Sequence, residues 1–189
     1  MDFYIDQTLY TGAPENLSDR LPKEVRTYEL LDSLQVPYIR LDHDATASIE
    51  YCMDVEKILG IHICKNLFLC NQQKTKFYML MMPGNKKFKT KNLSKQINSA
   101  RLSFANAEQM ETLLDVTPGS LTVLALLKDK EKRVNLLIEE NVLKEEYFAC
   151  HPMVNTATVK FKTEDLINKI LPALNREYIL VNLECKDDE

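Results

Sequence analysis

The segment ACHPMVNTATVKF (residues 149–161) combines residue types that can do chemistry with a strand-like pattern. His151, Asn155 and Thr156 stand directly ahead of an alternating apolar run. Asparagine and threonine side chains commonly bond backbone groups in turns, so these residues can hold a turn together. Imidazole, amide and hydroxyl groups can equally line a ligand site. From this segment alone, a braced turn and a binding site are both open interpretations.

A lysine interrupts the apolar pattern of the segment ICKNLFLC. Residues two apart on a strand share a face, so Lys65 shares its face with Ile63, Leu67 and Leu69 and lies in the middle of it. Burying an ammonium group among apolar side chains is costly. We therefore expect Lys65 either to reach solvent at a strand edge or to meet an anion. Asn66 adds a second polar group beside it.

The turn TPGS offers backbone chemistry rather than side-chain chemistry. Gly119 and Ser120 follow Pro118, and such a turn can present free N–H groups to an oxyanion or a phosphate. An isolated PGS is more often an ordinary connection between two elements. Both interpretations therefore stay open at this point.

Cysteine and histidine residues raise two further kinds of site. His62 and Cys64 are two apart, but no CxxC or HxxxH pair accompanies them, so we expect no metal and no other cofactor. Cys150 and His151 are adjacent and would point to opposite faces of a strand, which is poor geometry for a thiolate–imidazole pair. A pairing of Cys64 with His43 or His151 depends on the fold. Buried thiols are the simpler interpretation.

The charge distribution indicates a local basic surface. The 189-residue chain has a formal net charge of −4, which on average does not favour a polyanion partner. The segment NKKFKTKNLSK nevertheless contains five lysines and no acid, and phosphate binding responds to the local field. The candidate phosphate-binding residues of this segment are Lys86, Lys87, Lys89, Lys91 and Lys95.

Composition and the first residues favour a cytoplasmic protein without a membrane anchor. Hydrophobic residues make up 45% and charged residues 28%, which is ordinary for a globular protein. The longest apolar runs, such as LTVLALL, are too short to span a bilayer. The first ten residues have no basic segment followed by an apolar one, so we expect no secretory signal. Five cysteines, an odd number, are then expected to be reduced.

These candidate residues require elements that position them, and the pattern predicts one domain. Residues 1–22 are polar and turn-rich and are predicted to be an N-terminal extension, followed by a domain at 23–189. Helices are expected at 23–34, 45–60, 92–97, 106–115 and 162–174, with Ser48, Asn106 and Thr163 as caps and Gly60 as a terminator. Strands are expected at 36–43, 62–71, 76–83, 100–105, 121–128, 133–140 and 178–184, and in the segment that ends at 161. The mixed order predicts an α+β fold.

Four of these motifs together resemble one protein family. KNLFL, RLSFA, TPGSLT and HPMVNTAT are similar, in order and in spacing, to the motifs of the freestanding prolyl-tRNA editing proteins. These proteins belong to the YbaK-like superfamily and are related to the editing insertion of bacterial prolyl-tRNA synthetase. The similarity extends from about Lys23 to about Leu183. It implies an editing-domain fold with a mixed, barrel-like β core flanked by helices.

The resemblance implies an aminoacyl-tRNA deacylase whose substrate is alanyl-tRNA(Pro). A synthetase pocket sized for proline rejects the smaller alanine poorly, and a second site can remove it. The partners implied are tRNA(Pro) and, as a second candidate, prolyl-tRNA synthetase. The reaction implied is attack of water on the aminoacyl ester, assisted by the free ribose hydroxyl of the terminal adenosine, without a metal.

The resemblance also assigns roles to individual residues. Lys65 would pair with the 3′-terminal phosphate or hold the substrate end, and Asn66 would line the pocket. The backbone of Gly119 and Ser120 would face the scissile ester. The remaining roles are the shaping of the aminoacyl pocket by His151 and the bracing of its loop by Asn155 and Thr156.

Three positions depart from the family pattern. The glycine loop of the family reads Gly-x-x-x-Pro, but Val123 stands at the proline position; His43 is followed by Asp44 rather than proline; and Cys64 replaces a threonine. The departure at Val123 and the N-terminal extension leave room for an alternative, a non-catalytic module of the same fold that binds aminoacyl-tRNA or a synthetase. A purely structural role for the motif residues is the third hypothesis, and it leaves Lys65 unexplained. The preference for alanine over cysteine, serine or threonine esters stays open.

Overall fold

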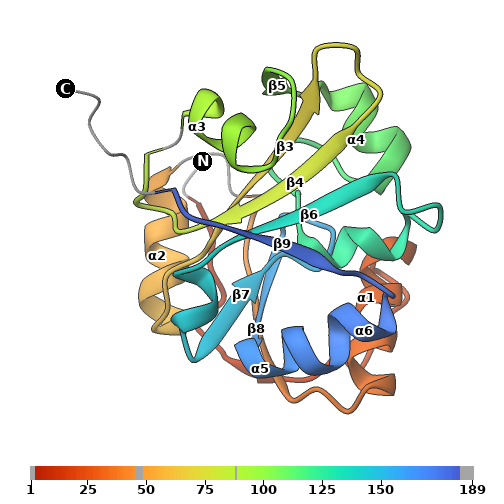
Figure 1. The fold of residues 1–189 in the computed structure, drawn as a ribbon. Coiled ribbons are helices and arrows are strands. Elements are labelled where there is room, and N and C mark those ends of the chain that lie inside the picture. The colour runs from red at the N-terminus through yellow and green to blue at the C-terminus, as the bar shows by residue number, and fades with distance from the viewer. Residues whose placement is uncertain (1–2, 46–48, 88, 184–189) are drawn as a thin grey trace.

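The structure, a computed structural model, describes residues 3–45, 49–87 and 89–183. Two β-sheets form the centre of this part of the chain, and helices lie around them (Figure 1). The mixed α+β class expected from the sequence is confirmed.

The elements follow one another in mixed order. The first half contains β1 (Tyr10–Thr11), α1 (Pro22–Ser33), β2 (Tyr38–Asp42), α2 (Ile49–Leu59), β3 (Lys65–Asn71), β4 (Phe77–Met82), α3 (Thr90–Gln96), β5 (Leu102–Phe104) and α4 (Ala107–Leu114). The second half contains η1 (Val123–Leu127), β6 (Val134–Glu139), η2 (Val142–Lys144), β7 (Tyr147–Cys150), β8 (Ala157–Lys162), α5 (Thr163–Asp165), η3 (Leu166–Ile170), α6 (Leu171–Ala173) and β9 (Tyr178–Val181).

The two sheets differ in strand direction. The five-stranded sheet has the order β5-β3-β4-β6-β9. In it, β3 and β4 form the expected antiparallel hairpin, with Lys65 opposite Met82, while β6 and β9 run parallel to their neighbours. The four-stranded sheet has the order β1-β2-β8-β7 and is antiparallel. It ends near the site residues, because His43 follows β2 and His151 follows β7.

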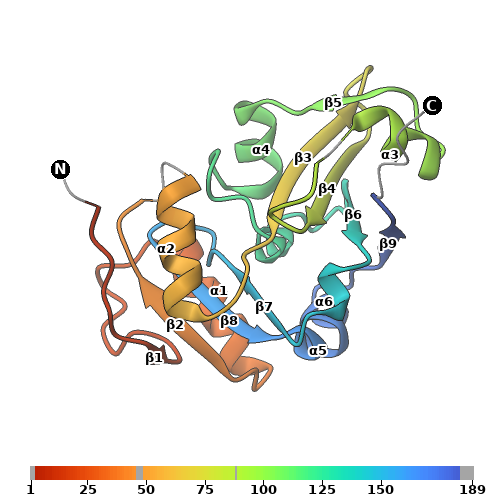
Figure 2. The same ribbon diagram turned by 90° about the vertical axis from the view of Figure 1, so that its left-hand side faces the viewer.

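Apolar side chains fill both faces of the five-stranded sheet. One cluster lies between the sheets and includes Phe68 of β3 and Phe148 of β7. A second cluster lies on the other face, where Leu93 of α3 packs with Leu69 and Leu80. Figure 2 shows α3 on the side of β3 and β4 that faces away from β7 and β8. Successive residues of β3 therefore alternate between the inter-sheet core and the α3 side.

The strand predicted at 121–128 is wrong, because this segment forms the 3₁₀ helix η1. The backbone N–H of Ala125 donates to the carbonyl of Thr122 at 3.1 Å, and the Thr122 hydroxyl accepts from the N–H of Leu124 at 3.4 Å. An apolar run without alternation is compatible with a buried strand and with a buried helix, so its pattern could not separate the two.

One predicted helix cap is not observed as expected, and another is not tested. Thr163 is the first residue of α5 rather than its cap, and its buried hydroxyl has no hydrogen-bond partner in the described part of the chain. The residue at the N-cap position is Lys162, whose side chain makes no capping bond. The predicted cap Ser48 lies outside the described residues. In contrast, Asn106 caps α4 as predicted and forms a capping box with Gln109.

The segment predicted to be an N-terminal extension packs against the domain. Its strand β1 pairs with β2, with Tyr10 opposite Arg40, and Ile5 forms a bridge with His43. Helix α1 then begins at Pro22. The division of the chain at residue 22 remains a prediction, but the segment before it contributes a strand to the second sheet.

Candidate functional site

The loop at 117–122 lies against two other motifs predicted from the sequence. The amide Nδ2–H of Asn66 donates to the carbonyl of Leu121 at 3.0 Å, which joins β3 to the loop at 117–122. A Cβ added to Gly119 would lie 3.4 Å from Nδ2 of Asn155, so this loop also touches the loop at 151–156. The tertiary structure thus brings Asn66, Gly119 and Asn155 to one place.

Asn66 carries an unused hydrogen-bond acceptor at this place. Its Oδ1 atom is buried and has no hydrogen-bond partner in the described part of the chain. A buried polar atom without a partner costs about 1–3 kcal/mol. A donor group on a ligand would therefore be stabilised by Asn66.

Lys65 lies at the solvent-exposed start of β3. The prediction that it shares a face with Leu67 and Leu69 agrees with the packing of both leucines on the α3 side of the sheet. The expectation that it lies in the middle of an apolar face is wrong, since it is the first residue of the strand and is exposed. Its ammonium group forms no ion pair among the described residues. The pleat directs it away from the face that carries Asn66, so the two side chains can contact different parts of one ligand.

The loop at 117–122 contains a tight turn in which the backbone N–H groups of the two predicted residues, Gly119 and Ser120, differ in their bonding. Gly119 has a φ of +90°, a conformation that glycine adopts without steric cost. Its N–H has no partner in the part of the chain that the structure describes. The N–H of Ser120 instead donates to the carbonyl of Thr117 at 2.9 Å, and the Ser120 side chain is buried. The expectation that Ser120 presents its backbone N–H to a ligand is therefore corrected, and of these two residues Gly119 retains a free N–H.

His151 is a neutral, half-buried side chain with a fixed tautomer. Its Nδ1–H donates to the carbonyl of Ala157 at 2.8 Å, which leaves Nε2 as an acceptor. Burial lowers the pKa of His151 to about 4, with a smaller contribution from the neighbouring ring of His43 and an opposing one from the bond to Ala157. A neutral imidazole at ordinary pH can contact a small side chain or accept a hydrogen bond.

The bracing predicted for Asn155 and Thr156 comes from other groups. Neither side chain makes a hydrogen bond within the described residues, and Thr156 is exposed. The loop is held instead by the bond from the His151 side chain to the carbonyl of Ala157 and by a main-chain bond from the N–H of His43 to the carbonyl of Thr156 at 3.0 Å. Asn155 is consequently free to contact a ligand together with Gly119.

The cysteines near this site are protonated thiols. Burial raises the pKa of Cys64 to about 12, and carboxylates at some distance act in the same direction. Burial likewise raises the pKa of Cys150 to about 12, against a hydrogen bond with Thr122. A thiol with so high a pKa is a poor nucleophile. Within the described residues, no group of three or more histidine, cysteine or acidic side chains is placed to hold a metal ion.

The lysine segment divides into one paired residue and several free ones. Lys86 forms an ion pair with Glu139, which is fully buried, so the prediction that Lys86 binds a phosphate is corrected. Lys87, Lys89, Lys91 and Lys95 are exposed and form no ion pair with any other described residue. A depression of about 500 Å³ is lined by Thr90, Lys91, Ser94, Lys95, Ser99 and Arg101.

Sequence reasoning missed Arg101 as a member of this basic surface. Arg101 stood in a segment predicted to be a strand, outside the continuous lysine run. The turn after α3 returns the chain to β5 and places Arg101 beside the helix. A larger depression, of about 630 Å³, lies between α1 and the region after η1 and includes Met153 but none of the predicted site residues.

Comparison with known proteins agrees with this fold. The family model for the aminoacyl-tRNA editing domain matches residues 43–169. The chain is 30% identical over 155 residues to the prolyl-tRNA editing protein ProX of Acetoanaerobium sticklandii, covering 81% of this chain and 93% of that protein. It is 26% identical over 141 residues to prolyl-tRNA synthetase associated domain-containing protein 1 of Danio rerio, covering 74% and 76%.

A solved structure shows the same fold at low sequence identity. The crystal structure of a candidate trans-editing enzyme for prolyl-tRNA synthetase superposes with a TM-score of 0.63 at 13% identity, covering 86% of this chain and 97% of that one. The family match and the similarity to ProX show an editing enzyme, an aminoacyl-tRNA deacylase. The chain belongs to the aminoacyl-tRNA editing domain family. No helix within the described residues is long and apolar enough to cross a membrane.

Proposed function

We propose that this protein is a trans-editing hydrolase that deacylates mischarged tRNA, with alanyl-tRNA(Pro) as its substrate. The observation that carries the proposal is the meeting of Asn66, the Gly119 turn and the loop of His151 and Asn155 at one site. The relatives named as prolyl-tRNA editing and prolyl-tRNA synthetase associated proteins support the assignment to tRNA(Pro). A cytoplasmic location accompanies this proposal.

The proposed reaction is hydrolysis of the aminoacyl ester. The oxygen of a water molecule bonds to the ester carbonyl carbon, and the bond from that carbon to the ribose oxygen breaks. The neighbouring ribose hydroxyl of the substrate assists by relaying the water proton to the leaving oxygen. The products are free alanine and uncharged tRNA. An activated ester needs little more than a positioned water and a stabilised oxyanion.

Each site residue has a role in this reaction. The free N–H of Gly119 faces the developing oxyanion, and Lys65 holds the terminal phosphate of the substrate. The buried Oδ1 of Asn66 accepts a hydrogen bond from the substrate. The neutral ring of His151 contacts the amino-acid side chain, and Asn155 completes that wall beside Gly119. Proline is excluded by size, because it is larger than the alanine that the site admits.

The acceptor stem of the tRNA lies on the exposed basic surface in this proposal. That surface consists of Lys87, Lys89, Lys91 and Lys95, extended by Arg101. Lys86 is left out, because its charge is paired with Glu139.

The deciding experiment follows ester loss from alanyl-tRNA(Pro) and prolyl-tRNA(Pro) with purified protein. We expect faster loss of alanine than in buffer and little loss of proline. Lys65→Ala should lower kcat/KM about 10- to 100-fold, the value of a charge-assisted hydrogen bond of about 1.5–3 kcal/mol. Its thermal stability should stay unchanged, because the side chain is exposed. Lys76→Ala, also at an exposed position of the hairpin, is the matched control. Failure to cleave any small aminoacyl ester refutes the proposal.

A non-catalytic module that binds aminoacyl-tRNA or prolyl-tRNA synthetase is the second candidate. One observation favours it: the N–H of Ser120 is already used within the turn, so of the two predicted backbone donors only the N–H of Gly119 is free to bind an oxyanion. Tight binding of alanyl-tRNA(Pro) without ester loss, or co-purification of the synthetase without hydrolysis, would select this candidate.

A further inference from the structure

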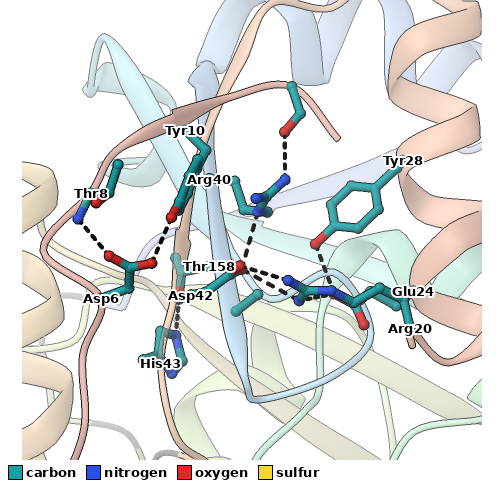
Figure 3. Close-up of polar contacts among 12 residues, drawn as sticks. Asp6, Thr8, Tyr10, Arg20, Glu24, Tyr28, Arg40, Asp42, His43 and Thr158 are labelled. Carbon is teal, nitrogen blue, oxygen red and sulfur yellow. Dashed lines mark hydrogen bonds and ion pairs between the residues drawn. The ribbon is translucent and has the colours of Figure 1, made fainter. Parts of the chain in front are cut away.

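His43, at the end of β2, is held by hydrogen bonds on both ring nitrogens. Its Nδ1–H donates to the carbonyl of Asp44 at 2.8 Å. Its Nε2 therefore accepts, and the hydroxyl of Thr158 donates to it at 2.9 Å. The side chain is 5% exposed, and the dashed bond to Thr158 is visible in Figure 3. Neither nitrogen is free to exchange a proton with a substrate, so this histidine is fixed in place rather than chemically active.

The fixed ring of His43 lies against the ring of His151. The two ring centroids are 6.0 Å apart, and the planes meet at 61° in an edge-to-face arrangement. The backbone adds a second connection, because the N–H of His43 donates to the carbonyl of Thr156 at 3.0 Å. His43 thus contacts the loop at 151–156 through both its side chain and its main chain. A displacement of His43 must therefore move the ring of His151, which the proposed function places against the amino acid.

The first residues of the chain cover His43 from the other side. We call residues 3–12 the N-terminal strap. Ile5 forms an antiparallel bridge with His43, and the N–H of Asp44 donates to the carbonyl of Tyr4 at 2.9 Å. The N–H of Tyr4 donates in return to the carboxylate of Asp44 at 3.1 Å. The ring of Phe3 lies 6.3 Å from that of His43.

A network of charged groups fastens the N-terminal strap to β2 and α1 (Figure 3). The hydroxyl of Tyr10 donates to Asp6 at 2.7 Å, and the Tyr10 ring covers the guanidinium of Arg40 at 4.7 Å. Arg40 donates to the carbonyl of Gly12 at 3.0 Å and to Asp42 at 3.1 Å. Both Arg40 and Glu24 are almost fully buried, and Arg20 joins Glu24 to Asp42. The strap is therefore anchored on both sides of His43.

We propose that His43 is a positioning residue of the aminoacyl site, and that the N-terminal strap and Thr158 hold it so that His151 has one fixed orientation toward the amino acid. The proposal rests on the proposed function for its substrate. The strap lies before residue 43, where the match to the family model begins. A fixed His151 ring helps the pocket to discriminate between amino acids by size, because a mobile ring could move aside and admit the larger amino acid.

The first test measures selectivity in the full chain with Thr158→Val, which removes the donor to His43 and keeps the volume. We expect KM for alanyl-tRNA(Pro) to rise about 3- to 10-fold, with a smaller change in kcat, as for the loss of one hydrogen bond. The ratio of kcat/KM for alanyl-tRNA(Pro) to that for prolyl-tRNA(Pro) should fall with it. His43→Leu should lower this ratio further, and His43→Gln, whose amide oxygen can accept from Thr158, should restore part of it.

The second test addresses the strap with Asp44→Ala, which removes the carboxylate that accepts from Tyr4. This variant should also lower the ratio of kcat/KM for alanyl-tRNA(Pro) to that for prolyl-tRNA(Pro), by about 2- to 5-fold. Asp54→Ala is the matched control: this exposed carboxylate on α2 pairs only with Lys57 among the described residues, and its loss should leave the ratio unchanged.

A third readout does not depend on activity. The imidazole proton resonances of His151 should shift in Thr158→Val and in Asp44→Ala, but not in Asp54→Ala. If wild-type protein cleaves neither ester, the proposed function fails. The His151 resonances then still show whether Thr158 and the N-terminal strap hold His151 in place through His43. Unchanged selectivity in folded Thr158→Val and Asp44→Ala would overturn the inference. If the protein is inactive, unchanged His151 resonances in these two variants would overturn it. Should His43→Leu fail to fold, these two variants carry the test.

Discussion

Single residues at this site are specified by backbone geometry as much as by side-chain chemistry. Gly119 adopts a φ of +90° and leaves its N–H free, whereas the next residue, Ser120, uses its N–H to close the turn. Lys65 and Asn66 are neighbours in sequence, but the strand pleat gives them different surroundings. The chemistry therefore depends on which atom of each residue is left unbonded.

Gly119→Ala should reduce both stability and activity. The added Cβ forces a conformation that costs an alanine about 1–2 kcal/mol, and it would contact Asn155 at 3.4 Å. Gly60→Ala is the control, because Gly60 also has a positive φ, of +62°, with nothing within 4 Å of the added Cβ. Thermal denaturation should show a comparable loss in both variants, whereas the deacylation rate should fall only in Gly119→Ala. Equal activity in the two variants would remove the role assigned to Gly119.

At the scale of elements, the short helix η1 explains why the chain tolerates a departure from the family pattern. Val123 stands where the family has proline, and it is the first residue of η1. The N–H of a residue at this position has no partner within the helix, and proline fits there without loss. Thr122 before it is extended, with φ −149° and ψ 151°, as a residue before proline must be.

Val123→Pro should consequently be accepted without loss of fold or activity. Where the backbone is already compatible, proline stabilises a protein by about 0.4–1 kcal/mol through the unfolded state. A urea denaturation curve and the deacylation rate measure the two effects. Ala125→Pro is the contrasting variant, because the N–H of Ala125 donates to Thr122 and would be lost. A Val123→Pro variant as unstable as Ala125→Pro would show that the loop differs from the family geometry.

The second element-scale feature is the basic surface around α3, which the proposed function assigns to tRNA binding. The triple variant Lys91→Ala, Lys95→Ala, Arg101→Ala should weaken tRNA binding and reduce the slope of log affinity against log salt concentration. Three exposed cations on the turn before β6, replaced in Lys128→Ala, Lys130→Ala, Arg133→Ala, provide a control of equal charge. Binding of uncharged tRNA across a salt series measures both. Equal effects of the two triple variants would indicate only a non-specific attraction.

At the scale of the whole molecule, the buried His43 and the half-buried His151 link stability to pH. Burial lowers the pKa of both His43 and His151, the latter to about 4. An unfolded histidine has a pKa of about 6.5, so the unfolded chain binds more protons than the folded one between these values. Stability is therefore fully present above pH 6.5 and is lost as the pH falls toward 4.

From pH 7 to pH 5, we expect the free energy of unfolding to fall by about 2 kcal/mol through His151, at 1.4 kcal/mol for each pH unit below 6.5. Chemical denaturation at a series of pH values measures this slope. His151→Gln should flatten it, and His62→Gln should not, because His62 is 93% exposed. A slope that is the same in wild type and His151→Gln would mean that the imidazole is charged or solvated in the folded protein.

The sequence by itself determined most elements and the identity of the motifs. The β3–β4 hairpin, the Asn106 cap and the end of α2 at Gly60 follow from local alternation, capping and glycine signals, which act over a few residues. The same local signals could not distinguish a buried strand from the 3₁₀ helix at 123–127, since an unbroken apolar run satisfies both.

Only the tertiary structure decided which polar atoms are available. The pairing of Lys86 with buried Glu139 joins residues 53 apart in sequence, and the contact of Gly119 with Asn155 joins two loops. The ring of His43 reaches Thr158 across 115 residues. Hydrogen bonds and burial at such separations depend on how the sheets pack. The motifs therefore predicted a site, whereas packing determined that Ser120 and Lys86 are already bonded and that Gly119, Lys65 and the Oδ1 of Asn66 remain free.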